Sequence, residues 1–495
     1  MRSNFLKHKR EFDDLVEVVN ILIQRNKLEQ AAETISKIAL YTTKNQTGYY
    51  ASLKLEKLIG LIAQKIDFKS IQVHTTSNSR RVLHVVTELY HIGGHSRLLK
   101  NWIKRDQDSE HTIVATSMLK NDLDNIIAFW ELTGVKTFAI EGSIIKKAIA
   151  LNTFSEGFDF IILHIHQYDI IPSLSFSSFE RNRLPIFFMN HADHTFWIGR
   201  LISNAIICYR ENILKLDALR RGISPEDQFY LPLPIQEYKS AIDPSSKSDF
   251  KKELNLSEDS IVLLCVSSLY KFTPYDDINF FKDVIKVLEK DSRLILLIIG
   301  VNEGDRFTIS HKRIKFLGIK KDIGHYLQGA DIYIENFPYG SYTSVLDAMN
   351  YNLPVQLMHT PNETLSIFPE KEGFSYPKSY DEWEKKLLNL INDVVKQKEL
   401  INIQKKHLEK NNYQELWKEK LNNLYKLQKG KIEITKDDMS FNTSIEIFYD
   451  TLKHNAGTIN YKDLFSLFSF KDFILNKALL NLFIKNTLVR LKNKF

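Results

Sequence analysis

The sequence predicts an α/β protein with two Rossmann-like, doubly wound domains that face a cleft, preceded by a helical prefix and followed by a helical tail. Two observations lead to this fold class. Short apolar runs rich in β-branched residues alternate with helical segments, as they do in buried parallel sheets. The alternation stops at residues 232–255, which contain Pro232, Pro234 and Pro244 among serines and lysines, and then starts again. This segment is therefore predicted to link two halves.

Residues 1–75 are predicted to form the helical prefix. Apolar residues such as Leu15, Val18 and Leu22 recur three and four positions apart, which is the spacing of a helix with one buried face. A polar break near residue 75 then leads into the first strand. We therefore expect the first Rossmann-like domain at residues 81–235.

The strands of both halves can be read directly from the sequence. In the first half the strand-like runs are RVLHVVTEL, HTIVATS, VKTFAI, FDFIILHIH, PIFFMNH and NAIICYR. In the second half, residues 255–425, they are SIVLLCVSSL, LILLIIG, IKFLG, DIYIENF and LPVQLM. Residues 431–495 are predicted to form the helical tail.

Composition excludes several classes of protein. In 495 residues, a hydrophobic fraction of 43% and a charged fraction of 26% exclude a mostly disordered, collagenous or coiled-coil chain. The net charge of +7 suits anionic ligands such as nucleotides, and it does not indicate nucleic acid binding. Cys208 and Cys265 lie in apolar runs, which favours buried reduced thiols in a reducing compartment. The N-terminus has no apolar stretch typical of a secretory signal, so we expect a cytoplasmic protein.

The last 25 residues, 471–495, form a basic amphipathic segment with six basic residues and one acidic residue. A helix of this kind can lie on the inner face of an anionic membrane, with its apolar side among the acyl chains. The alternative is a helix that packs on the protein body.

The most informative stretch is DIYIENFPYGSYTSVLDAMNYNLPV, from Asp331 to Val355. A strand is expected to end near Phe337, followed by a turn and by a helix that begins near Thr343. Free N–H groups at such a helix start can bind a diphosphate. Plain helix capping by a Thr343 or Ser344 hydroxyl is the alternative.

This stretch resembles the donor site of GT-B nucleotide-sugar glycosyltransferases, and the resemblance covers roughly residues 81–425. FPYGSYTSVLDAM is similar both to the retaining family 4-like enzymes, which carry two acidic residues eight positions apart, and to the O-GlcNAc-transferase-like proteins. Asp347 fills the second acidic position, which in the first family holds the ribose, whereas Tyr339 occupies the first position. The resemblance implies the following donor-binding residues: Gly93, Gly94, Lys271, Tyr339, Gly340, Ser341, Tyr342, Thr343, Ser344 and Asp347.

A second segment, SSLYKFTP, follows the first strand of the second half. It is similar to the Leu-Tyr-Lys segment of the O-GlcNAc-transferase-like proteins, whose lysine contacts the donor diphosphate. This similarity implies that Lys271 neutralises the departing diphosphate, since a fixed cation stabilises charge that develops in the transition state. A surface lysine is the alternative.

In the first half, Gly93 and Gly94 follow the first strand, where glycine lets the backbone come close to a phosphate or an acceptor. They resemble the glycine-rich first loop of GT-B enzymes, although an ordinary turn would explain them as well. His95 and Arg97, just beyond, are expected to point towards the cleft, Arg97 towards the acceptor.

The segment FFMNHADHTFWIG delivers His191, Asp193 and His194 to the carboxyl end of another strand. The spacing supplies too few ligands for a closed zinc site, so no metal is predicted. A histidine on the corresponding loop of retaining GT-B enzymes touches the donor sugar, which implies that role for His191. His191, Asp193 and His95 are the candidate bases, and His194 is a candidate acceptor contact. His164 and His166 lie on one strand face and either line the cleft or belong to the core.

The function predicted from these features is metal-independent transfer of a sugar, of hexosyltransferase type, from a nucleotide-diphosphate donor, UDP-linked by resemblance, without a further cofactor. The expected acceptor is a bacterial surface glycan or a lipid-linked glycan. Protein O-glycosylation and an inactive GT-B scaffold subunit are the alternatives. Retention or inversion, the donor sugar and the oligomeric state are left open by the sequence.

Overall fold

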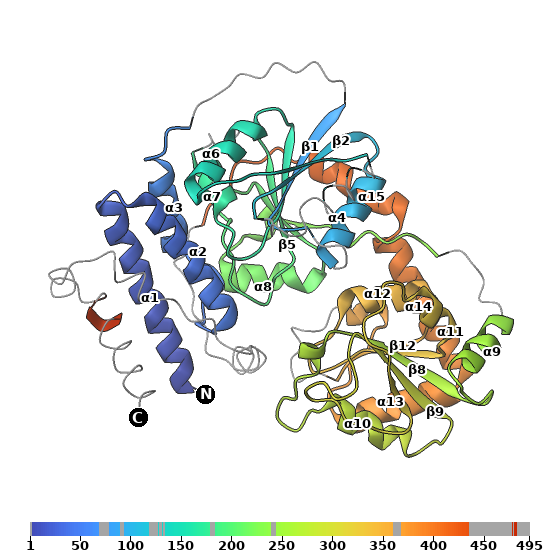
Figure 1. Ribbon diagram of the computed structural model, residues 1–495. Coiled ribbons are helices and arrows are strands. Elements are labelled where there is room, and N and C mark those ends of the chain that lie inside the picture. The colour runs from blue at the N-terminus through green and yellow to red at the C-terminus, as the bar shows by residue number, and fades with distance from the viewer. Residues whose placement is uncertain are drawn as a thin grey trace. The chain divides into compact units, whose positions relative to one another are not determined.

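The computed structural model describes residues 2–68, 79–89, 94–117, 127, 131, 134–178, 184–238, 244–359, 368–434, 478 and 480–482. The chain divides into two compact units (Figure 1). The first contains residues up to Tyr209, Ile213–Leu231 and the chain from Asn422 onwards, and the second contains Arg210–Asn212 and Pro232–Leu421.

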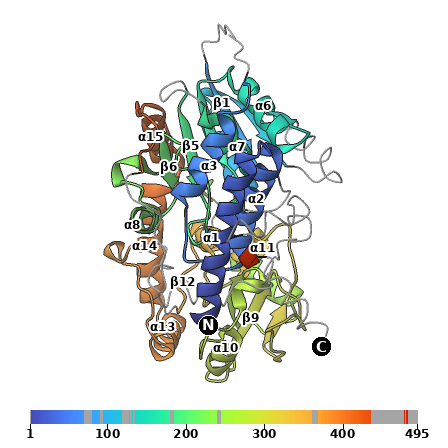
Figure 2. The same cartoon turned by 90° about the vertical axis from the view of Figure 1, so that its left-hand side faces the viewer.

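The first unit begins with three helices, α1 (Arg2–Gln24), α2 (Leu28–Lys44) and α3 (Leu53–Ala63). The Ser52 hydroxyl accepts a hydrogen bond from the Leu55 N–H and so caps the start of α3. The apolar faces of these helices share one hydrophobic core with the sheet that follows. Figures 1 and 2 show the three helices side by side, with α3 next to α7 (Ile171–Ser177). The prefix is thus an integral part of the first unit.

The first sheet has seven parallel strands in the order β3-β2-β1-β4-β5-β6-β7. The strands are β1 (Arg80–Val86), β2 (Ser109–Ala115), β3 (Lys136–Ala139), β4 (Phe160–His164), β5 (Ile186–Asn190), β6 (Ala205–Cys208) and β7 (Gln228–Tyr230). The helices that connect them are α4 (Gly94–Arg105), α6 (Ile144–Ser155), α7 and α8 (Glu211–Arg221), and a short helical turn, η1, covers Pro225–Asp227. The first six strands are those predicted from the sequence, whereas β7 was not predicted.

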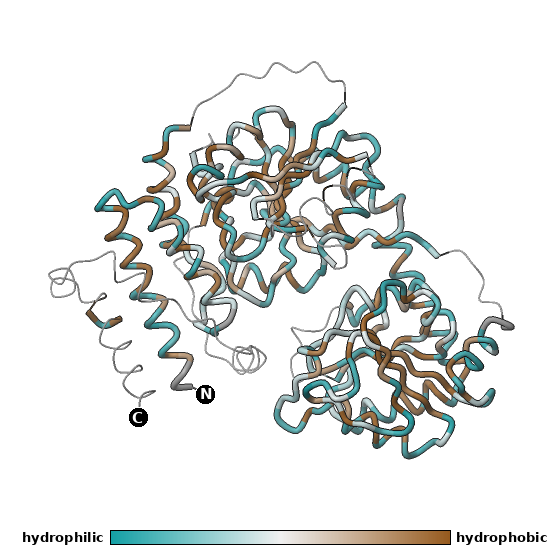
Figure 3. The backbone as a smooth tube through the Cα atoms, in the orientation of Figure 1, coloured by the Kyte–Doolittle hydropathy of each residue, from teal (hydrophilic) through white to brown (hydrophobic). Residues whose placement is uncertain are grey.

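The two faces of the first sheet have different coverings. Leu83 and Val85 of β1 belong to the core that α1, α2, α3 and α7 share. The alternate residue Val86 packs instead with Leu99 of α4. This alternation is the two-residue period of a strand buried on both sides. Figure 3 shows the apolar strands at the centre of each unit.

The second unit contains five parallel strands in the order β10-β9-β8-β11-β12. They are β8 (Ile261–Val266), β9 (Leu294–Ile299), β10 (Ile314–Phe316), β11 (Ile332–Ile334) and β12 (Val355–Gln356). Its helices are α9 (Pro244–Glu253), α10 (Phe280–Leu288), α11 (Gly324–Gly329), α12 (Tyr342–Asn350), α13 (Tyr380–Asn392) and α14 (Val394–Asn411), with short turns η2 (Leu269–Phe272) and η4 (Glu370–Glu372). Helix α15 (Gln414–Tyr425) leads back to the first unit. All five predicted strands are present, and the predicted fold class, with two doubly wound parallel sheets, is confirmed.

Both cysteines are buried free thiols, as predicted. Burial raises the pKa of the Cys208 and Cys265 thiols well above the ordinary value, so both are protonated at neutral pH. The thiols are therefore small core residues.

The predicted amphipathic tail, 471–495, lies mostly outside the described residues. Of the few that are described, Leu482 is 1% exposed and belongs to the core shared by the N-terminal helices and the first sheet. This residue packs on the protein body. Among the described residues, no helix is both long and apolar enough to cross a membrane.

Candidate active site

The topology of the second sheet singles out one position for a ligand. Strands β8 and β11 are neighbours, and the strand order reverses its direction between them. In a doubly wound sheet, ligands bind at the carboxyl ends of the strands on either side of such a reversal. The segments that leave these two strand ends contain Lys271 and the turn from Glu335 to Ser341. The strand order therefore brings the candidate donor residues of the second half to the same edge of the sheet.

Lys271 lies in η2, directly after β8, and its ammonium reaches the turn after β11. The Nζ atom donates to the carbonyl of Gly340 and to the Ser341 hydroxyl, each at 3.1 Å. The Ser341 hydroxyl is also 3.0 Å from the Ser267 hydroxyl. The structure therefore places Lys271 beside the start of α12.

Helix α12 begins at Tyr342, one residue before the predicted start, and Ser341 is its N-cap residue. The Ser341 side chain makes no capping bond, because its hydroxyl faces Lys271. The Ser344 hydroxyl donates to the carbonyl of Val266 at 3.0 Å, so it ties α12 to β8 and does not cap the helix. An α-helix leaves its first N–H groups without partners inside the helix, and these groups carry the positive end of the helix dipole. Such an end favours an anion.

Glu335 is a buried acidic residue of this site that the sequence analysis did not single out. One carboxylate oxygen, Oε2, accepts from the Met358 N–H at 3.0 Å. The other, Oε1, lies against Gly340: a Cβ atom added there would be 2.2 Å from it. The sequence does contain a signal for Glu335, since it is the one acidic residue within the apolar run IYIENF.

Burial shifts the pKa values of both charged groups towards neutrality. Burial lowers the pKa of Lys271 to about 8, although the attraction of Glu335 opposes the shift. Burial raises the pKa of Glu335 to about 7, and the opposing causes are the N–H groups of Met358 and Ser341 and the charge of Lys271. Perturbed groups of this kind, at a strand end beside a helix start, are typical of functional sites.

The remaining predicted donor residues lie around this cluster. The Tyr339 ring is 5.7 Å from the Lys271 ammonium, measured to the ring centroid. Tyr342 packs its ring 5.9 Å from that of Phe368, and burial raises the pKa of its phenol above the ordinary range. Asp347 is buried further along α12, and Thr343 is half-buried in its first turn.

The first unit has a second cluster, built from histidines. The strand order of its sheet reverses between β1 and β4. His95 on α4, His166 after β4 and His191 after β5 come together at this edge. The His95 and His191 ring centroids are 3.7 Å apart, and those of His95 and His166 are 5.8 Å apart. The predicted catalytic residues His95 and His191 are thus in contact, and His166 lies beside His95.

The protons of His191 can be assigned from its neighbours. Its Nε2 atom is 3.1 Å from the carbonyl oxygen of Ile165, which can only accept a hydrogen bond. The proton of the neutral ring is therefore assigned to Nε2, and Nδ1 carries a lone pair. Burial, with the nearby His95, lowers the pKa of His191 well below the ordinary value, and burial likewise lowers the pKa of His95 to about 4. Both rings are neutral at neutral pH.

The other predicted residues of the first unit have varied surroundings. Asp193 is buried, and its Oδ1 atom is 3.4 Å from Nδ1 of the more exposed His194. Gly94 begins α4, on which Arg97 is exposed, whereas Gly93 lies outside the described residues. His164 belongs to the core, where its Nε2 atom is 3.1 Å from Nδ1 of the buried His84. Among the described residues, no group of three or more potential ligands could hold a metal ion.

Comparison with known proteins agrees with this architecture. Residues 260–393 match the family described as "Glycosyl transferases group 1". No curated protein sequence matches the chain. HepE from Anabaena, solved with UDP and glucose, is similar with a TM-score of 0.53 and 15% identity, over 70% of this chain and 100% of that one. A mutant of TarM from S. aureus, solved with UDP, α-GlcNAc-glycerol and fondaparinux, has a TM-score of 0.52 and 12% identity, over 70% of this chain and 100% of that one.

A third structure is similar over a larger share of this chain. A mutant O-GlcNAc transferase from Thermobaculum terrenum has a TM-score of 0.50 and 12% identity, and the similarity covers 90% of this chain and 85% of that one. At these identities the likeness concerns the fold. The chain therefore has the two-domain GT-B fold of these glycosyltransferase structures, and residues 260–393 match the glycosyl transferases group 1 family.

Proposed function

We propose that this protein transfers a sugar from a nucleotide-diphosphate donor, and that the second unit binds the donor. One observation carries the proposal: the Lys271 ammonium lies 3.1 Å from the hydroxyl of Ser341, the N-cap residue of α12. A cation and a helix N-terminus together form a site for a diphosphate. HepE has been solved with UDP and with UDP-glucose, which supports a UDP-linked donor.

The chemistry follows from where charge develops. As the bond between the sugar's anomeric carbon and the diphosphate oxygen breaks, the diphosphate takes the electron pair. Lys271 and the first N–H groups of α12 stabilise this charge more in the transition state than in the bound donor. These groups supply the electrostatic role that a divalent ion would otherwise have, so we propose transfer without a metal or a further cofactor.

The acceptor is proposed to bind the first unit near His95 and His191. When the acceptor hydroxyl forms its bond to the anomeric carbon, its proton must leave. The Nδ1 lone pair of His191 is one base for it, and in a retaining mechanism the departing phosphate oxygen is the other. Arg97 and the pair formed by Asp193 and His194 are proposed acceptor contacts. Asp347 is proposed to hold the ribose.

For the acceptor we favour a bacterial surface glycan or a lipid-linked glycan. TarM, whose structure contains α-GlcNAc-glycerol, supports a glycan or polyol acceptor. The six basic residues of segment 471–495 suit the inner membrane surface, whereas Leu482 of this segment is buried in the first unit. Protein O-glycosylation is the second candidate, favoured by the similarity to the O-GlcNAc transferase over 90% of this chain. A catalytically inactive scaffold is the alternative that Tyr339, in place of an acidic residue, suggests.

The proposal is tested with purified protein and a panel of radiolabelled nucleotide sugars. We expect slow hydrolysis of one donor, and loss of that activity by at least about 10²-fold in Lys271→Ala. Lys312→Ala is the matched control, because Lys312 is exposed in the same unit. If no donor is bound or hydrolysed, the proposal is wrong. Binding without turnover, even with cell-extract acceptors, would identify the scaffold.

A further inference from the structure

The connection between β5 and β6, residues 191–204, is mostly buried although it has no regular secondary structure. We call it the β5–β6 loop. It carries His191, Asp193 and His194, and its residues Phe196, Trp197 and Ile198 are at most 2% exposed. A buried irregular segment must find hydrogen-bond partners for its backbone outside itself. The source of those partners determines what holds the candidate site in place.

Arg221, at the end of α8, supplies the first set of partners. Its side chain is fully buried, and its Nη2 atom donates to the carbonyls of Asp193 at 3.0 Å and Thr195 at 2.6 Å. Its guanidinium also lies 4.9 Å from the Trp197 ring centroid. The single side chain of Arg221 therefore fixes two carbonyls of the β5–β6 loop and packs on a third residue of it.

Asp217 holds this arginine and the preceding strand together. Its Oδ1 atom accepts from Nη1 of Arg221, and its Oδ2 atom accepts from the Asn190 side chain at 2.6 Å. Asn190 is the last residue of β5, directly before His191. The pair Asp217–Arg221 thus anchors the loop to the end of the strand from which it emerges.

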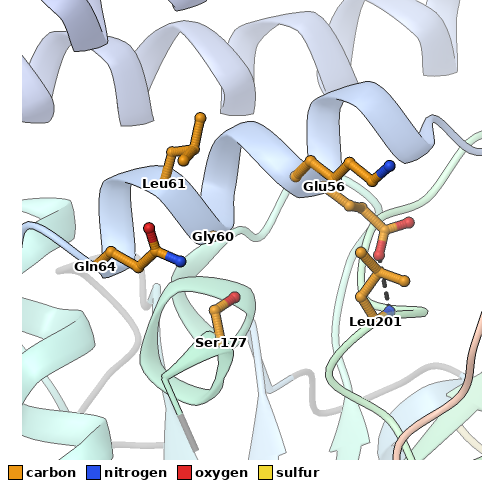
Figure 4. A pocket seen from close by; sticks show the side chains of 7 residues that line it. Glu56, Gly60, Leu61, Gln64, Ser177 and Leu201 are labelled. Carbon is orange, nitrogen blue, oxygen red and sulfur yellow. Dashed lines mark hydrogen bonds between the residues drawn. The ribbon is translucent and has the colours of Figure 1, made fainter.

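A second buried pair ties the other end of the loop to the N-terminal helices. The Nε atom of Arg200 donates to Glu56 of α3 at 2.7 Å, and its Nη1 atom donates to the carbonyl of Arg221 at 2.7 Å. The second carboxylate oxygen of Glu56 accepts from the Leu201 N–H at 2.9 Å, the bond drawn in Figure 4. The side chains of Arg200 and Glu56 are at most 4% exposed. Two buried ion pairs, Glu56–Arg200 and Asp217–Arg221, are therefore joined through the backbone carbonyl of Arg221.

Other contacts of the prefix reach the same loop. The carbonyl of Tyr50 accepts from the Trp197 N–H at 3.3 Å. The Phe12 ring of α1 lies 5.8 Å from the Phe196 ring. The prefix therefore supplies hydrogen bonds, a charge and apolar surface to the β5–β6 loop.

We propose that Glu56 is a positioning residue, which acts through Arg200 and Arg221 to hold the β5–β6 loop, and with it His191, in the conformation that the reaction needs. The helical prefix accordingly contributes to the acceptor site by holding the β5–β6 loop in place. The effect on turnover rests on the function proposed above, whereas the effect on the loop does not. Glu56 itself need touch neither substrate nor reacting atoms.

The test compares Glu56→Gln with the wild-type chain by hydrogen–deuterium exchange. Loss of the charge leaves Arg200 without its carboxylate, so we expect amides within 191–204 to exchange at least about tenfold faster. Amides of the second unit should be unchanged. Glu33→Gln on α2 is the matched control, since Glu33 forms only an exposed ion pair with Lys37.

A second control distinguishes the loss of the Glu56 carboxylate from a change in the cavity beside it. An open cavity of about 450 Å³ adjoins Glu56 and Leu201, and Gln64 of the same helical segment lines it (Figure 4). Gln64→Ala changes this cavity without touching the carboxylate, so it should leave loop exchange and kinetics as in the wild-type chain. If Gln64→Ala reproduces the effects of Glu56→Gln, the proposal is wrong.

The kinetic arm uses hydrolysis of the nucleotide sugar that the wild-type chain accepts. For Glu56→Gln we expect kcat to fall about tenfold or more while the KM for the donor stays the same, because we propose that the second unit binds the donor. Glu56→Asp, which keeps the charge, should recover part of kcat. A folded Glu56→Gln variant with wild-type loop exchange overturns the proposal, whatever its turnover.

Arg200→Lys covers the case in which Glu56→Gln does not fold. Lysine keeps the positive charge but cannot reach Glu56 and the Arg221 carbonyl together, as the guanidinium does. We expect the same faster exchange in 191–204, and unchanged exchange there would contradict the proposal. If the wild-type chain hydrolyses no nucleotide sugar, the proposed function fails, and the exchange experiment still decides the role of Glu56.

Discussion

The Lys271 ammonium lies 3.1 Å from the hydroxyl of Ser341, the residue that precedes α12. Lys271 follows β8 and Ser341 follows β11, so the contact joins two residues that are 70 apart in sequence and lie beyond neighbouring strand ends. It places a cation at the positive end of a helix, an arrangement suited to the single anion that we propose as the ligand.

The pH dependence of nucleotide binding should report on this lysine. Because burial lowers the pKa of Lys271 to about 8, the ammonium loses its proton as the pH rises through 8. We expect affinity for UDP, measured by calorimetry, to be constant well below this pH and to fall by at least about tenfold above it. Lys271→Arg should abolish the fall, since arginine stays charged. An identical fall in the arginine variant would mean that another group titrates.

Gly340 should tolerate no side chain. A Cβ atom there would lie 2.2 Å from Oε1 of Glu335 and 2.9 Å from Sδ of Met358, both buried. We expect Gly340→Ala to displace the turn before α12 and to weaken UDP binding by about 10²-fold, with a lower Tm. Gly60→Ala is the control, because a Cβ atom at Gly60 meets nothing within 4 Å and the residue lies within α3. The control should be slightly more stable, by about 0.5–1 kcal/mol.

Glu335 should make stability depend on pH. Burial raises its pKa from 4.5 to about 7, so the folded state binds its proton more tightly than the unfolded state does. The stabilisation is full below pH 4.5 and is lost as the pH rises to about 7, by roughly 3 kcal/mol. Glu335→Gln should remove this contribution to the pH dependence, as measured by urea unfolding between pH 4.5 and 8. A variant that loses stability over this range as the wild-type chain does would show that Glu335 is not responsible.

His191 should be neutral and protonated on Nε2. The Ile165 carbonyl accepts that proton, and burial keeps the pKa of the ring well below its ordinary value. Nitrogen-15 NMR of a histidine-labelled sample should therefore show an unprotonated Nδ1 from pH 5.5 to 8. His191→Asn provides the assignment. A protonated Nδ1 in this range would exclude His191 as the base that we propose.

Much of the fold could be predicted because its signal is local. Of the twelve strands among the described residues, eleven lie where the sequence places them, and most of these are apolar runs flanked by turn residues. Strand β7 was missed because its residues Gln228–Tyr230 are few and only half-buried, so no apolar run marks them. The choice of Lys271 depended on its resemblance to a known segment, since a lysine after a strand is not informative by itself.

The sequence by itself determined the two parallel sheets, the free buried thiols and the segments that leave the strand ends. It could not determine which of those segments meet, because strand order is set by pairing between distant parts of the chain. Only the tertiary structure brought His95 to His191, placed Glu335 beside Gly340, and tied Glu56 to Arg200. Such contacts join residues far apart in sequence, and their energies come from burial and charge, which exist only once the sheets and helices have packed.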